Sequence, residues 1–599
     1  MTPLIAAAPQ FVQPEIWWTW LAPYLLVLGA AVVGVLVEAF VTPRARRSTQ
    51  LTLALVALLG AAGWNVWLWV DQLAPTEFNA IALVNGSLMV SYFTLALQTV
   101  ILVVAALALL VVADRSRGAD DFAPTAAAIP GSDYEELART KGLQQTEIYP
   151  LFLFAVGGMV LFPAAGNLLT MFIALEILSL PLYVMSGMAR HRRLLSQEAS
   201  LKYFLLGAFS SAFFLMGMAL VYGYAGTINL WAITNGHAVQ VPEALVGGRP
   251  LLVMGVVMLL VGVLFKVGAV PFHQWTPDVY QGAPTSITGF MAACTKAAAF
   301  GAVIRIVVWF APFIGLDLHE EIQVTIVIVA IASMLLGSVL GVVQHDVKRL
   351  LAYSSIAHAG FVLVAVAGVL PYDGQTFVFP MNSAVIFYLL AYGLATVGAF
   401  AVVRLVRESQ GRGADAVTLG EATHLSQWAG LGRRSPFLAV AFSVFLLSFA
   451  GIPLTAGFIG KFTAFKVAVD GGLWWLAVLA VLCSAIAVFF YVRIIVLMFF
   501  VDPAADDAEP EPAREVVAVG ALGATSDAPV GTPLAGEPEA GVGLRLSDQL
   551  RRTSGGVTVL KGSVGSRVAI AVTMVGTLLL GVLPGPVLDL LEKTVNFLP

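Results

Sequence analysis

Long apolar runs, separated by short polar segments, follow one another from residue 20 almost to the last residue of the chain. A helix needs about 20 predominantly apolar residues to cross the hydrocarbon core of a bilayer. Counting each run of this length once predicts about fourteen membrane spans. The predicted spans are 20–40, 51–70, 92–112, 148–162, 168–188, 201–224, 251–270, 286–311, 323–343, 351–370, 383–406, 437–469, 473–501 and 568–590.

Two of the apolar stretches are interrupted internally. Segments 251–282 and 437–469 are too long for one simple crossing, and each contains Gly and Pro residues that break helices. Each is therefore predicted to form a discontinuous helix. Unwound backbone is tolerated at membrane depth only where protein or a water-filled cavity satisfies its polar groups, so both breaks predict a hydrated interior.

The composition agrees with this pattern. Of the 599 residues, 59% are hydrophobic and only 11% are charged, which lies far from the averages of soluble globular domains. The sequence therefore predicts an all-α polytopic membrane protein. The N-terminus lacks the basic flank and cleavage site of a secretory signal, so the first span is expected to remain as a helix.

Basic residues are concentrated in every second loop, and acidic residues in the loops between them. Because cytoplasmic loops are enriched in Lys and Arg, the basic loops predict the cytoplasmic side and both termini are expected on the outer, periplasmic side. The basic loop residues are Arg44, Arg46, Arg47, Arg190, Arg192, Arg193, Lys348, Arg349, Arg412, Arg433 and Arg434. The acidic ones are Asp71, Glu77, Asp317, Glu320, Glu321 and Asp373.

Two longer polar segments, 114–147 and 502–567, fall on the predicted cytoplasmic side. The second is rich in Ala, Pro, Gly, Asp and Glu, and has too few large apolar residues to build a core. It is expected to be a disordered cytoplasmic loop.

The chain lacks the residues that several kinds of chemistry require. The only cysteines, Cys294 and Cys483, lie inside apolar spans and are too few to hold an iron–sulfur cluster. No Gly-rich phosphate loop stands in a strand–helix context, and the seven histidines show no metal-ligand spacing. Redox or nucleotide chemistry is not expected in this chain alone, and no metal site is expected.

Ionisable residues inside the spans are the candidate functional sites. A charged residue at the bilayer centre costs roughly 2.5–3.5 kcal/mol on the insertion scale, so it is rarely kept without a function. Lys266 and Lys461 stand beside the two helix breaks, and Lys296 has small neighbours that let other helices or water approach. The candidates are Glu176, Lys202, Lys266, Lys296, Lys461 and His358.

Each candidate also has a purely structural alternative. Glu176 could form an ion pair that holds two helices together, Lys202 could extend to the membrane interface, and His358 could bond neighbouring helices. Arg305, Arg493 and Lys466 are interpreted as interface anchors.

These residue types suit proton transfer. Burial makes a lysine lose its proton more easily, and a nearby carboxylate opposes that loss, so moving or neutralising the acid switches the lysine. Several such lysines, joined by water and histidine, would form a lateral relay between two half-channels that open to opposite faces. Arginine does not suit this role because it stays protonated.

Six motifs around these residues together resemble one family, the N-type antiporter-like, proton-translocating subunits of respiratory complex I (NADH:quinone oxidoreductase). The resemblance covers roughly residues 148–500. The motifs are ALEILSLPLY at 174–183, EASLKY at 198–203, FKVGAVPFH at 265–273, WTPDVYQGAP at 275–284, KRLLAYSSIAH at 348–358 and GIPLTAGFIGKF at 451–462.

Related L-type and M-type subunits, and subunits of multi-component cation/proton antiporters, share the Glu and Lys pattern. The form of segment 278–284, a lysine rather than a histidine at 296, and a chain that does not continue into a long lateral helix favour the N type. Segments 114–147 and 502–567 are longer than this family leads us to expect, which leaves their contacts open.

The resemblance implies the division of the chain. An N-terminal unit, 1–147, would hold three spans and a cytoplasmic loop. Two inverted five-helix repeats, 148–311 and 312–501, would each contain one broken helix. The loop 502–567 and a C-terminal span, 568–599, would follow.

The resemblance also implies roles for the candidates. Glu176 and Lys266 would form the coupled pair, Lys296 the central relay, and Lys461 the terminal lysine toward the outer half-channel. Lys202 and His358 would be auxiliary.

The expected partners are other membrane subunits of the complex, including the M-type antiporter-like subunit and small membrane subunits, and the lipid bilayer, with no nucleic acid. No cofactor is expected in this chain: NAD, FMN, iron–sulfur clusters and quinone would be bound by other subunits, so the chain would be inert alone. The expected location is a bacterial cell (inner) membrane.

Three other functions remain open at this stage. A cation/proton antiporter subunit would have the same fold and transport sodium, although one glutamate among lysines does not favour sodium. In a structural scaffold the charges would only pair helices. An independent solute transporter would bind its substrate at a helix break.

Overall fold

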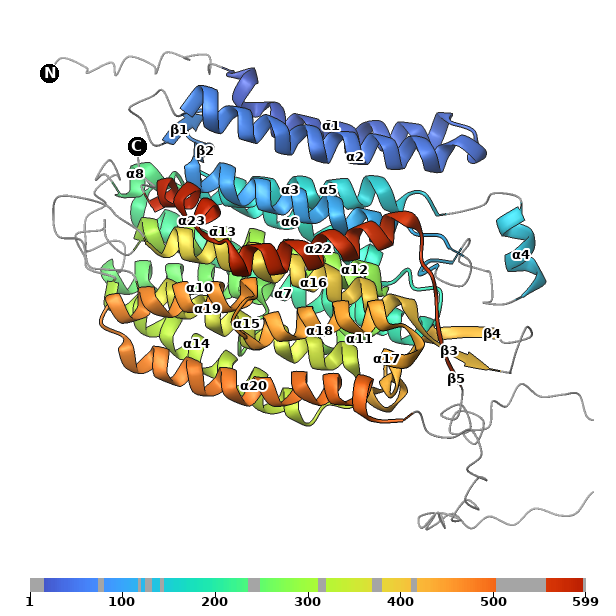
Figure 1. Cartoon of the computed structure of the whole chain (residues 1–599). Coiled ribbons are helices and arrows are strands. Elements are labelled where there is room, and N and C mark those ends of the chain that lie inside the picture. Colours follow the sequence, from blue (N-terminus) through green and yellow to red (C-terminus); the bar gives the residue numbers. More distant parts are fainter. Residues whose placement is uncertain are drawn as a thin grey trace, which may run out of the picture.

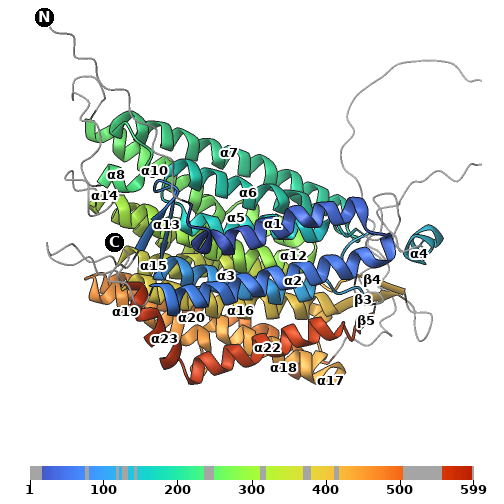
Figure 2. The same cartoon turned by 90° about the horizontal axis from the view of Figure 1, so that it is seen from above.

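The computed structural model describes residues 16–73, 80–116, 120–123, 132–140, 145–234, 248–310, 319–368, 380–410, 417–502 and 556–595. Nearly all of them are helical, and the long helices lie side by side along one common direction (Figures 1 and 2). The N-terminal helices are α1 (Trp18–Phe40), α2 (Pro43–Trp67), its π-helical extension η1 (Leu68–Leu73) and α3 (Tyr92–Val112).

Two further groups of helices follow, one within residues 148–311 and one within residues 312–501. The first group is α5 (Ile148–Leu161) with η2 (Phe162–Ala164), α6 (Leu168–Ser186), α7 (Arg193–Ala225), α10 (Gly248–Val267), α11 (Trp275–Gly282) and the continuous helix α12 (Thr285–Phe290), η3 (Met291–Thr295) and α13 (Lys296–Phe310). The second group is α14 (His319–Val342), α15 (Val347–Ala367), α16 (Met381–Leu405), α18 (Pro436–Ala450), α19 (Ala456–Asp470) and α20 (Trp474–Phe500).

The remaining helices are shorter or C-terminal. They are α4 (Asp133–Thr140), α8 (Leu230–Thr234), η5 (Leu425–Trp428), α17 (Leu431–Arg434), α22 (Val564–Val582), α23 (Gly585–Glu592) and η7 (Lys593–Val595). Of the described helices, twelve are long and apolar enough to cross a membrane. Two shorter apolar helices, Ile148–Ala164 and Pro436–Ala450, lie where the fourth and twelfth spans were predicted.

Both predicted helix breaks are present. α10 ends at Val267 and α11 begins at Trp275, whereas α18 ends at Ala450 and α19 begins at Ala456. Each first helix ends at a glycine with positive φ, Gly268 at 76° and Gly451 at 79°. Glycine terminates a helix in this conformation without the steric cost of a Cβ.

Two small sheets show that the described chain is not entirely helical. β1 (Ala80–Leu83) and β2 (Leu88–Ser91) form an antiparallel hairpin before α3. β3 (Val406–Gln410) lies between β4 (Val417–Glu421) and β5 (Gly556–Val559), antiparallel to both. The sequence pattern missed these strands because each has only four or five residues.

β5 also corrects the prediction that 502–567 is a disordered loop. Within that segment, β5 pairs with β3, and α22 begins at Val564 rather than at residue 568. The alternation in Gly556–Val559 was too short to distinguish a strand from loop on composition alone. Residues 503–555 lie outside the described part of the chain, as do the loop residues Glu77, Asp317, Asp373 and Arg412.

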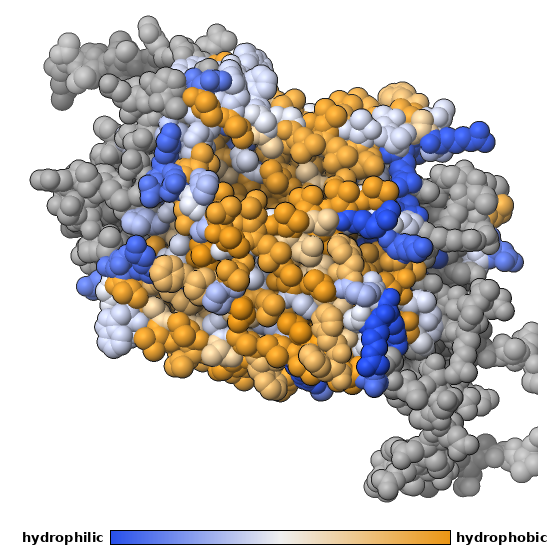
Figure 3. Space-filling model, in the orientation of Figure 1, coloured by the Kyte–Doolittle hydropathy of each residue, from blue (hydrophilic) through white to orange (hydrophobic). Residues whose placement is uncertain are grey.

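The two ends of the helix bundle differ. α1 begins and α23 ends at one end, on the left of Figure 1, whereas α17 and the three-stranded sheet lie at the other end. The face seen in Figure 3 is apolar across its middle, and hydrophilic residues gather toward the two ends of the helices. An apolar band between polar ends is the surface expected for a protein in a bilayer.

Candidate functional site

Lys266 is buried at the C-terminal end of α10, immediately before the first helix break, and is 2% exposed. Its ammonium donates a hydrogen bond to the Tyr183 hydroxyl at 3.0 Å. The same ammonium lies 4.7 Å, 4.8 Å and 5.6 Å from the ring centroids of Tyr183, Tyr203 and Phe265. Aromatic faces attract a cation electrostatically, so these rings stabilise the charge where water is excluded.

Glu176 lies on α6, two helical turns before Tyr183, and its carboxylate accepts a hydrogen bond from Ser211 of α7 at 2.5 Å. Glu176 is close enough to Lys266 for an electrostatic interaction. The described residues contain no Glu176–Lys266 ion pair within 4.0 Å. The structure thus brings the two predicted partners together, with a tyrosine hydroxyl on the lysine and a serine hydroxyl on the carboxylate.

Lys296 begins α13 directly after the π-helical turn η3, and is 4% exposed. Single π turns within α-helices are rare and occur often at functional sites. The Lys296 ammonium donates to the backbone carbonyl and the hydroxyl of Ser355 on α15, at 2.5 Å and 2.6 Å. It also lies 5.3 Å from the ring centroid of Tyr392.

Aromatic side chains fill the space between Lys266 and Lys296. The ring of Tyr203 stacks on that of Trp275 at 4.5 Å, and Trp275 contacts Tyr280. The hydroxyls of Tyr280 and Ser355 are 3.3 Å apart. Tyr280 lies on α11, so the broken helix of the first group reaches Ser355 of the second group, the residue that accepts from Lys296.

His358 lies one turn after Ser355 on α15 and is 3% exposed. Its Nδ1 is 2.8 Å from the Tyr388 hydroxyl, and its Nε2 is 3.4 Å from the Tyr491 hydroxyl. Tyr491 also bonds to Ser354. His358 lies within electrostatic reach of both Lys296 and Lys461.

Lys461 on α19 reaches back across the second helix break. Its ammonium donates to the carbonyls of Phe449 and Ala450, at 2.8 Å and 3.1 Å, and to the Ser484 hydroxyl at 2.7 Å. The two carbonyls end α18, where the helix dipole is negative, so the cation is held by an oriented backbone rather than by a carboxylate. The interaction with the ring of Phe361, at 4.8 Å, adds to this.

Lys202 belongs to a different environment. Its ammonium pairs with Glu198 at 2.6 Å and with Asp278 of α11 at 2.7 Å, and its side chain is 42% exposed. Asp278 also accepts from Arg349 of α15 at 2.7 Å. In the sequence Asp278 is only one residue of a motif, but in the structure it joins three helices. Its partners lie more than 70 positions away in either direction, so no local pattern reveals this role.

Arg305 is not an interface anchor as predicted. It is fully buried on α13 and donates to the carbonyls of Pro163 and Met89, and to the Thr94 hydroxyl, at 2.6 Å, 2.9 Å and 2.8 Å. The prediction was wrong because the carbonyls of η2 and β2 that accept from the guanidinium could not be located from the sequence. Arg493, by contrast, is partly buried and bonds to the Val342 carbonyl at 3.3 Å, and Lys466 is exposed.

A buried ionic cluster at the end of α16 had no signal in the sequence. Arg404, at the end of α16, pairs with Asp114 at 3.0 Å and with Asp121 at 2.9 Å, and Arg407 of β3 pairs with Asp121 at 2.8 Å. Burial by itself would raise the pKa of Asp121, but the two guanidiniums outweigh it and hold this pKa below its usual range. The same holds for two neighbouring carboxyl groups. Burial would raise the pKa of Asp114 and of Glu421, but Arg404 lowers the first and Arg407 lowers the second, so both lie below the usual range.

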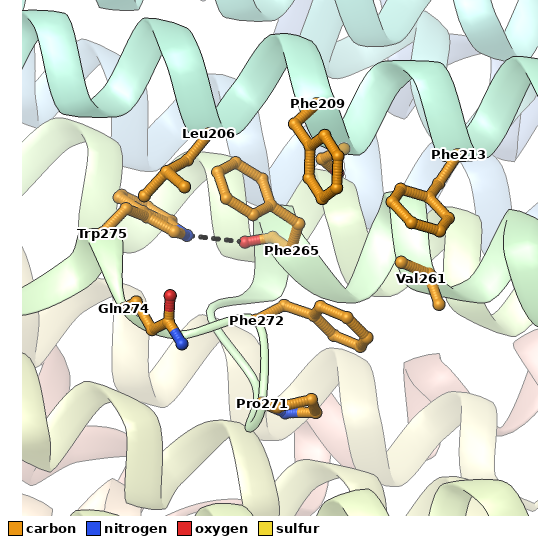
Figure 4. A pocket seen from close by; sticks show the side chains of 10 residues that line it. Leu206, Phe209, Phe213, Val261, Phe265, Pro271, Phe272, Gln274 and Trp275 are labelled. Carbon is orange, nitrogen blue, oxygen red and sulfur yellow. Dashed lines mark hydrogen bonds between the residues drawn. The ribbon is translucent and has the colours of Figure 1, made fainter.

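A cavity of about 260 Å³ lies beside the first helix break, between α7 and α10 (Figure 4). Aromatic and aliphatic side chains dominate its lining, among them Phe209, Phe213 and Phe272. In Figure 4 the Trp275 indole donates to the Phe265 carbonyl at 2.9 Å. The same carbonyl accepts from the backbone N–H of Gly268 at 3.1 Å, at the end of α10. The cavity is therefore mostly apolar, and Ser210 and Gln274 add polar groups to its lining.

The described residues contain no group of three or more His, Cys, Asp or Glu side chains placed to hold a metal ion. Both cysteines are buried free thiols. The lysine, glutamate and histidine side chains of the candidate site are groups that can take part in acid–base chemistry.

Comparisons with known proteins point to one family. A family model described as "NADH:quinone oxidoreductase/Mrp antiporter, TM" matches residues 165–487. The chain is 53% identical to the NADH-quinone oxidoreductase subunit N of Beutenbergia cavernae, over 98% of this chain and 99% of the relative. It is 46% identical to the subunit N of Mycobacteroides abscessus, over 98% of each chain.

Solved structures agree. A chain of respiratory complex I from Thermus thermophilus, with bound Aureothin, superposes with a TM-score of 0.66 at 29% identity, over 95% of this chain and 99% of that one. A chain of the Mrp complex from Dietzia sp. DQ12-45-1b gives a TM-score of 0.69 at 20% identity, over 96% and 97%. At that identity the second likeness concerns the fold alone.

Proposed function

This chain belongs to the antiporter-like membrane family of NADH:quinone oxidoreductase and Mrp antiporter subunits, and we propose that it moves protons through a relay of buried lysines, one glutamate and one histidine. Its relatives at 43–53% identity over nearly the full chain make it a proton-translocating subunit of the membrane arm of NADH:quinone oxidoreductase. The geometry around the buried lysines supports this relay.

The observation that carries the relay is the kind of partner that each buried lysine has. Lys266, Lys296 and Lys461 are bonded to hydroxyl and carbonyl oxygens, and to no carboxylate within 4.0 Å among the described residues. A fixed buried ion pair would hold each lysine in its charged form, whereas neutral acceptors leave both protonation states accessible. This arrangement favours proton transfer over a scaffold in which charges only join helices.

The relay would run in the order in which the groups lie. Glu176 and Lys266 would switch first, Lys296 would receive the change through the space around Tyr280 and Ser355, and His358 would connect Lys296 with Lys461. Lys202 would be auxiliary, since its ion pairs tie it to Glu198 and Asp278. Quinone reduction elsewhere in the complex would drive the first switch through neighbouring subunits.

The same proposal includes the organisation of the chain. Residues 148–311 and 312–501 would be two inverted repeats within fourteen crossings, because each group contains one broken helix with a buried lysine at the break. Lys266 lies just before the first break, and Lys461 bonds back across the second. The basic ends of α2, α7 and α17 would face the cytoplasm, and both termini would face the periplasm of a bacterial inner membrane. NAD, FMN, iron–sulfur clusters and quinone would be bound by other subunits.

The test is proton pumping alongside electron transfer in membranes that carry Lys266→Ala, with assembly checked by native electrophoresis. We expect both activities to fall together in an assembled complex, because the coupled pair loses its switchable cation. Lys466→Ala is the matched control, since this lysine is exposed on α19. Full activity of both variants would contradict the relay.

The family model is described by Mrp antiporters as well as by NADH:quinone oxidoreductase, which makes a cation/proton antiporter the second candidate. The candidate site contains three buried lysines and one carboxylate, that of Glu176, which lies within electrostatic reach of Lys266; this composition favours protons over sodium. Pumping that depends on sodium concentration in otherwise intact membranes would favour the antiporter.

A further inference from the structure

The environment of Lys266 contains two tyrosines whose hydroxyl groups differ in their hydrogen bonding. The Tyr183 and Tyr203 rings are at nearly the same distance from the ammonium, 4.7 Å and 4.8 Å. The Tyr183 hydroxyl accepts a hydrogen bond from that ammonium, whereas the buried Tyr203 hydroxyl has no hydrogen-bond partner in the described part of the chain.

Tyr183 is therefore the hydrogen-bond acceptor that the described residues provide for Lys266. An ammonium can donate three hydrogen bonds, and this one is buried, so the single acceptor fixes its direction. Tyr183 lies seven residues after Glu176 on α6. Residues two turns apart share a helix face, so Tyr183 presents its ring and hydroxyl on the side of Glu176.

The opposite helix leaves room for this hydroxyl at one position. Gly207 of α7 faces the Tyr183 hydroxyl so closely that an added methyl group would overlap it. The Tyr183 ring also meets Tyr203 and Phe204 edge to face, at centroid distances of 4.7 Å and 5.8 Å. The orientation of the side chain is thus fixed by packing from α7.

We infer that Tyr183 is a positioning residue: it holds the Lys266 ammonium within electrostatic reach of Glu176 while keeping the two groups from forming a direct ion pair. The inference rests on the proposed relay, in which this pair is the switch. A direct buried ion pair is costly to separate, whereas an ammonium shared between a phenol oxygen and aromatic faces gains or loses its proton with less rearrangement.

The test compares Tyr183→Phe with Tyr203→Phe in membranes that contain the assembled complex. Each substitution keeps the ring and removes one hydroxyl, but only the first removes the acceptor of the Lys266 ammonium. We expect Tyr183→Phe to lower electron transfer and proton pumping about tenfold, the size of effect that losing one charge-assisted hydrogen bond produces. We expect Tyr203→Phe to lower them by less than about twofold, because its hydroxyl leaves no partner unbonded.

A pH profile separates this role from a merely structural one. The titratable groups found around the ammonium in the described residues are Glu176 and Tyr183 on α6 and Tyr203 on α7. Without its acceptor the charged lysine is less favoured, so the alkaline limb of the rate profile is expected to move to lower pH in Tyr183→Phe. Gly207→Ala, which displaces the same hydroxyl without removing it, is expected to move the limb in the same direction.

Lys266→Ala in the same membranes keeps the two proposals distinguishable. If Lys266→Ala abolishes pumping while Tyr183→Phe and Tyr203→Phe have equal rates and unshifted pH profiles, the positioning role is overturned and the relay stands. If Lys266→Ala pumps normally, the relay is overturned and the positioning role with it. Tyr222→Phe, at a tyrosine of α7 that is 54% exposed, is the background control.

Discussion

At the residue scale, the position of one ammonium depends on a glycine. Gly451 ends α18 with a φ of 79°, and a Cβ added there would lie 2.9 Å from Lys461 Cδ and 3.3 Å from Lys461 Nζ. The glycine therefore does two things: it allows the left-handed turn of the break and it leaves space for the lysine that folds back over it. The same space lets the ammonium reach the last carbonyls of α18.

Gly451→Ala is predicted to lower proton pumping about tenfold, because the methyl group displaces the Lys461 ammonium from the carbonyls of Phe449 and Ala450. Gly472→Ala is the matched control: its φ is 81°, and nothing lies within 4 Å of an added Cβ. Both variants should lose about 1–2 kcal/mol of stability from the left-handed backbone. Equal pumping in two assembled variants would show that Lys461 does not depend on this contact.

At the scale of elements, Asp278 connects the two helix groups. It lies on α11, the second half of the first broken helix, and binds Lys202 of α7 and Arg349 of α15 at 2.7 Å each. Arg349 also donates to Gln281, one turn further along α11. Asp278 thus ties α11 to α7 and to α15 at once, and α11 also carries Tyr280, which approaches Ser355 beside Lys296.

Asp278→Asn is predicted to lower electron transfer and pumping several-fold, because the neutral side chain no longer holds both cations and α11 loses its position against α15. Glu198→Gln is the control, since Glu198 pairs with Lys202 alone among the described residues and its side chain is 56% exposed. An exposed pair of this kind contributes little, so activity should stay within about twofold of the parent. Coupled rates in the membranes measure both variants, and equal rates would contradict the prediction.

At the scale of the whole molecule, the cluster of Asp114, Asp121, Arg404 and Arg407 joins parts of the chain that lie far apart in sequence. Asp114 and Asp121 follow α3, Arg404 lies in the last turn of α16, and Arg407 lies in β3. Asp114 also accepts hydrogen bonds from the Ser563 backbone N–H and the Ser566 hydroxyl at the start of α22. The side chains of Arg404, Arg407 and Asp121 are at most 1% exposed. The cluster therefore joins the segment after α3, the end of α16, β3 and the start of α22 at one end of the bundle.

Asp121→Asn is predicted to destabilise the chain by about 3–5 kcal/mol, because two buried guanidiniums lose a shared counter-charge. Asp502→Asn, in a pair with Arg433 whose side chains are both 72% exposed, should change stability little. Thermal unfolding of the purified complex in detergent measures the difference. Similar unfolding temperatures for the two variants would contradict the prediction.

The same comparison has a defined pH dependence. The pKa of Asp121 is lowered in the folded protein, so the unfolded chain binds its proton first as the pH falls. The stabilisation is therefore complete above the unfolded pKa of about 3.9 and is lost as the pH falls below it. The difference between parent and Asp121→Asn should stay constant from about pH 7 to pH 5 and shrink below about pH 4; a difference that grows on acidification would contradict this sign.

The sequence by itself located the long apolar helices, both helix breaks and the buried lysines of the candidate site. These follow from local physics, since a hydrocarbon core requires about 20 apolar residues per helix, and clustered Gly and Pro residues favour a helix break. The cost of a charge in lipid singled out Glu176, Lys266, Lys296 and Lys461 without knowledge of their neighbours. The same reasoning could not say what each charge touches.

Only the tertiary structure decided the partners. Arg404 and Asp121 are 283 positions apart, and Lys296 meets Ser355 at a separation of 59. Because such contacts arise from the packing of distant helices, a local pattern carries no signal for them, and Arg305 was misjudged for this reason. The neutral acceptors around the three lysines, on which the relay depends, are likewise set by packing across α6, α15, α18 and α20.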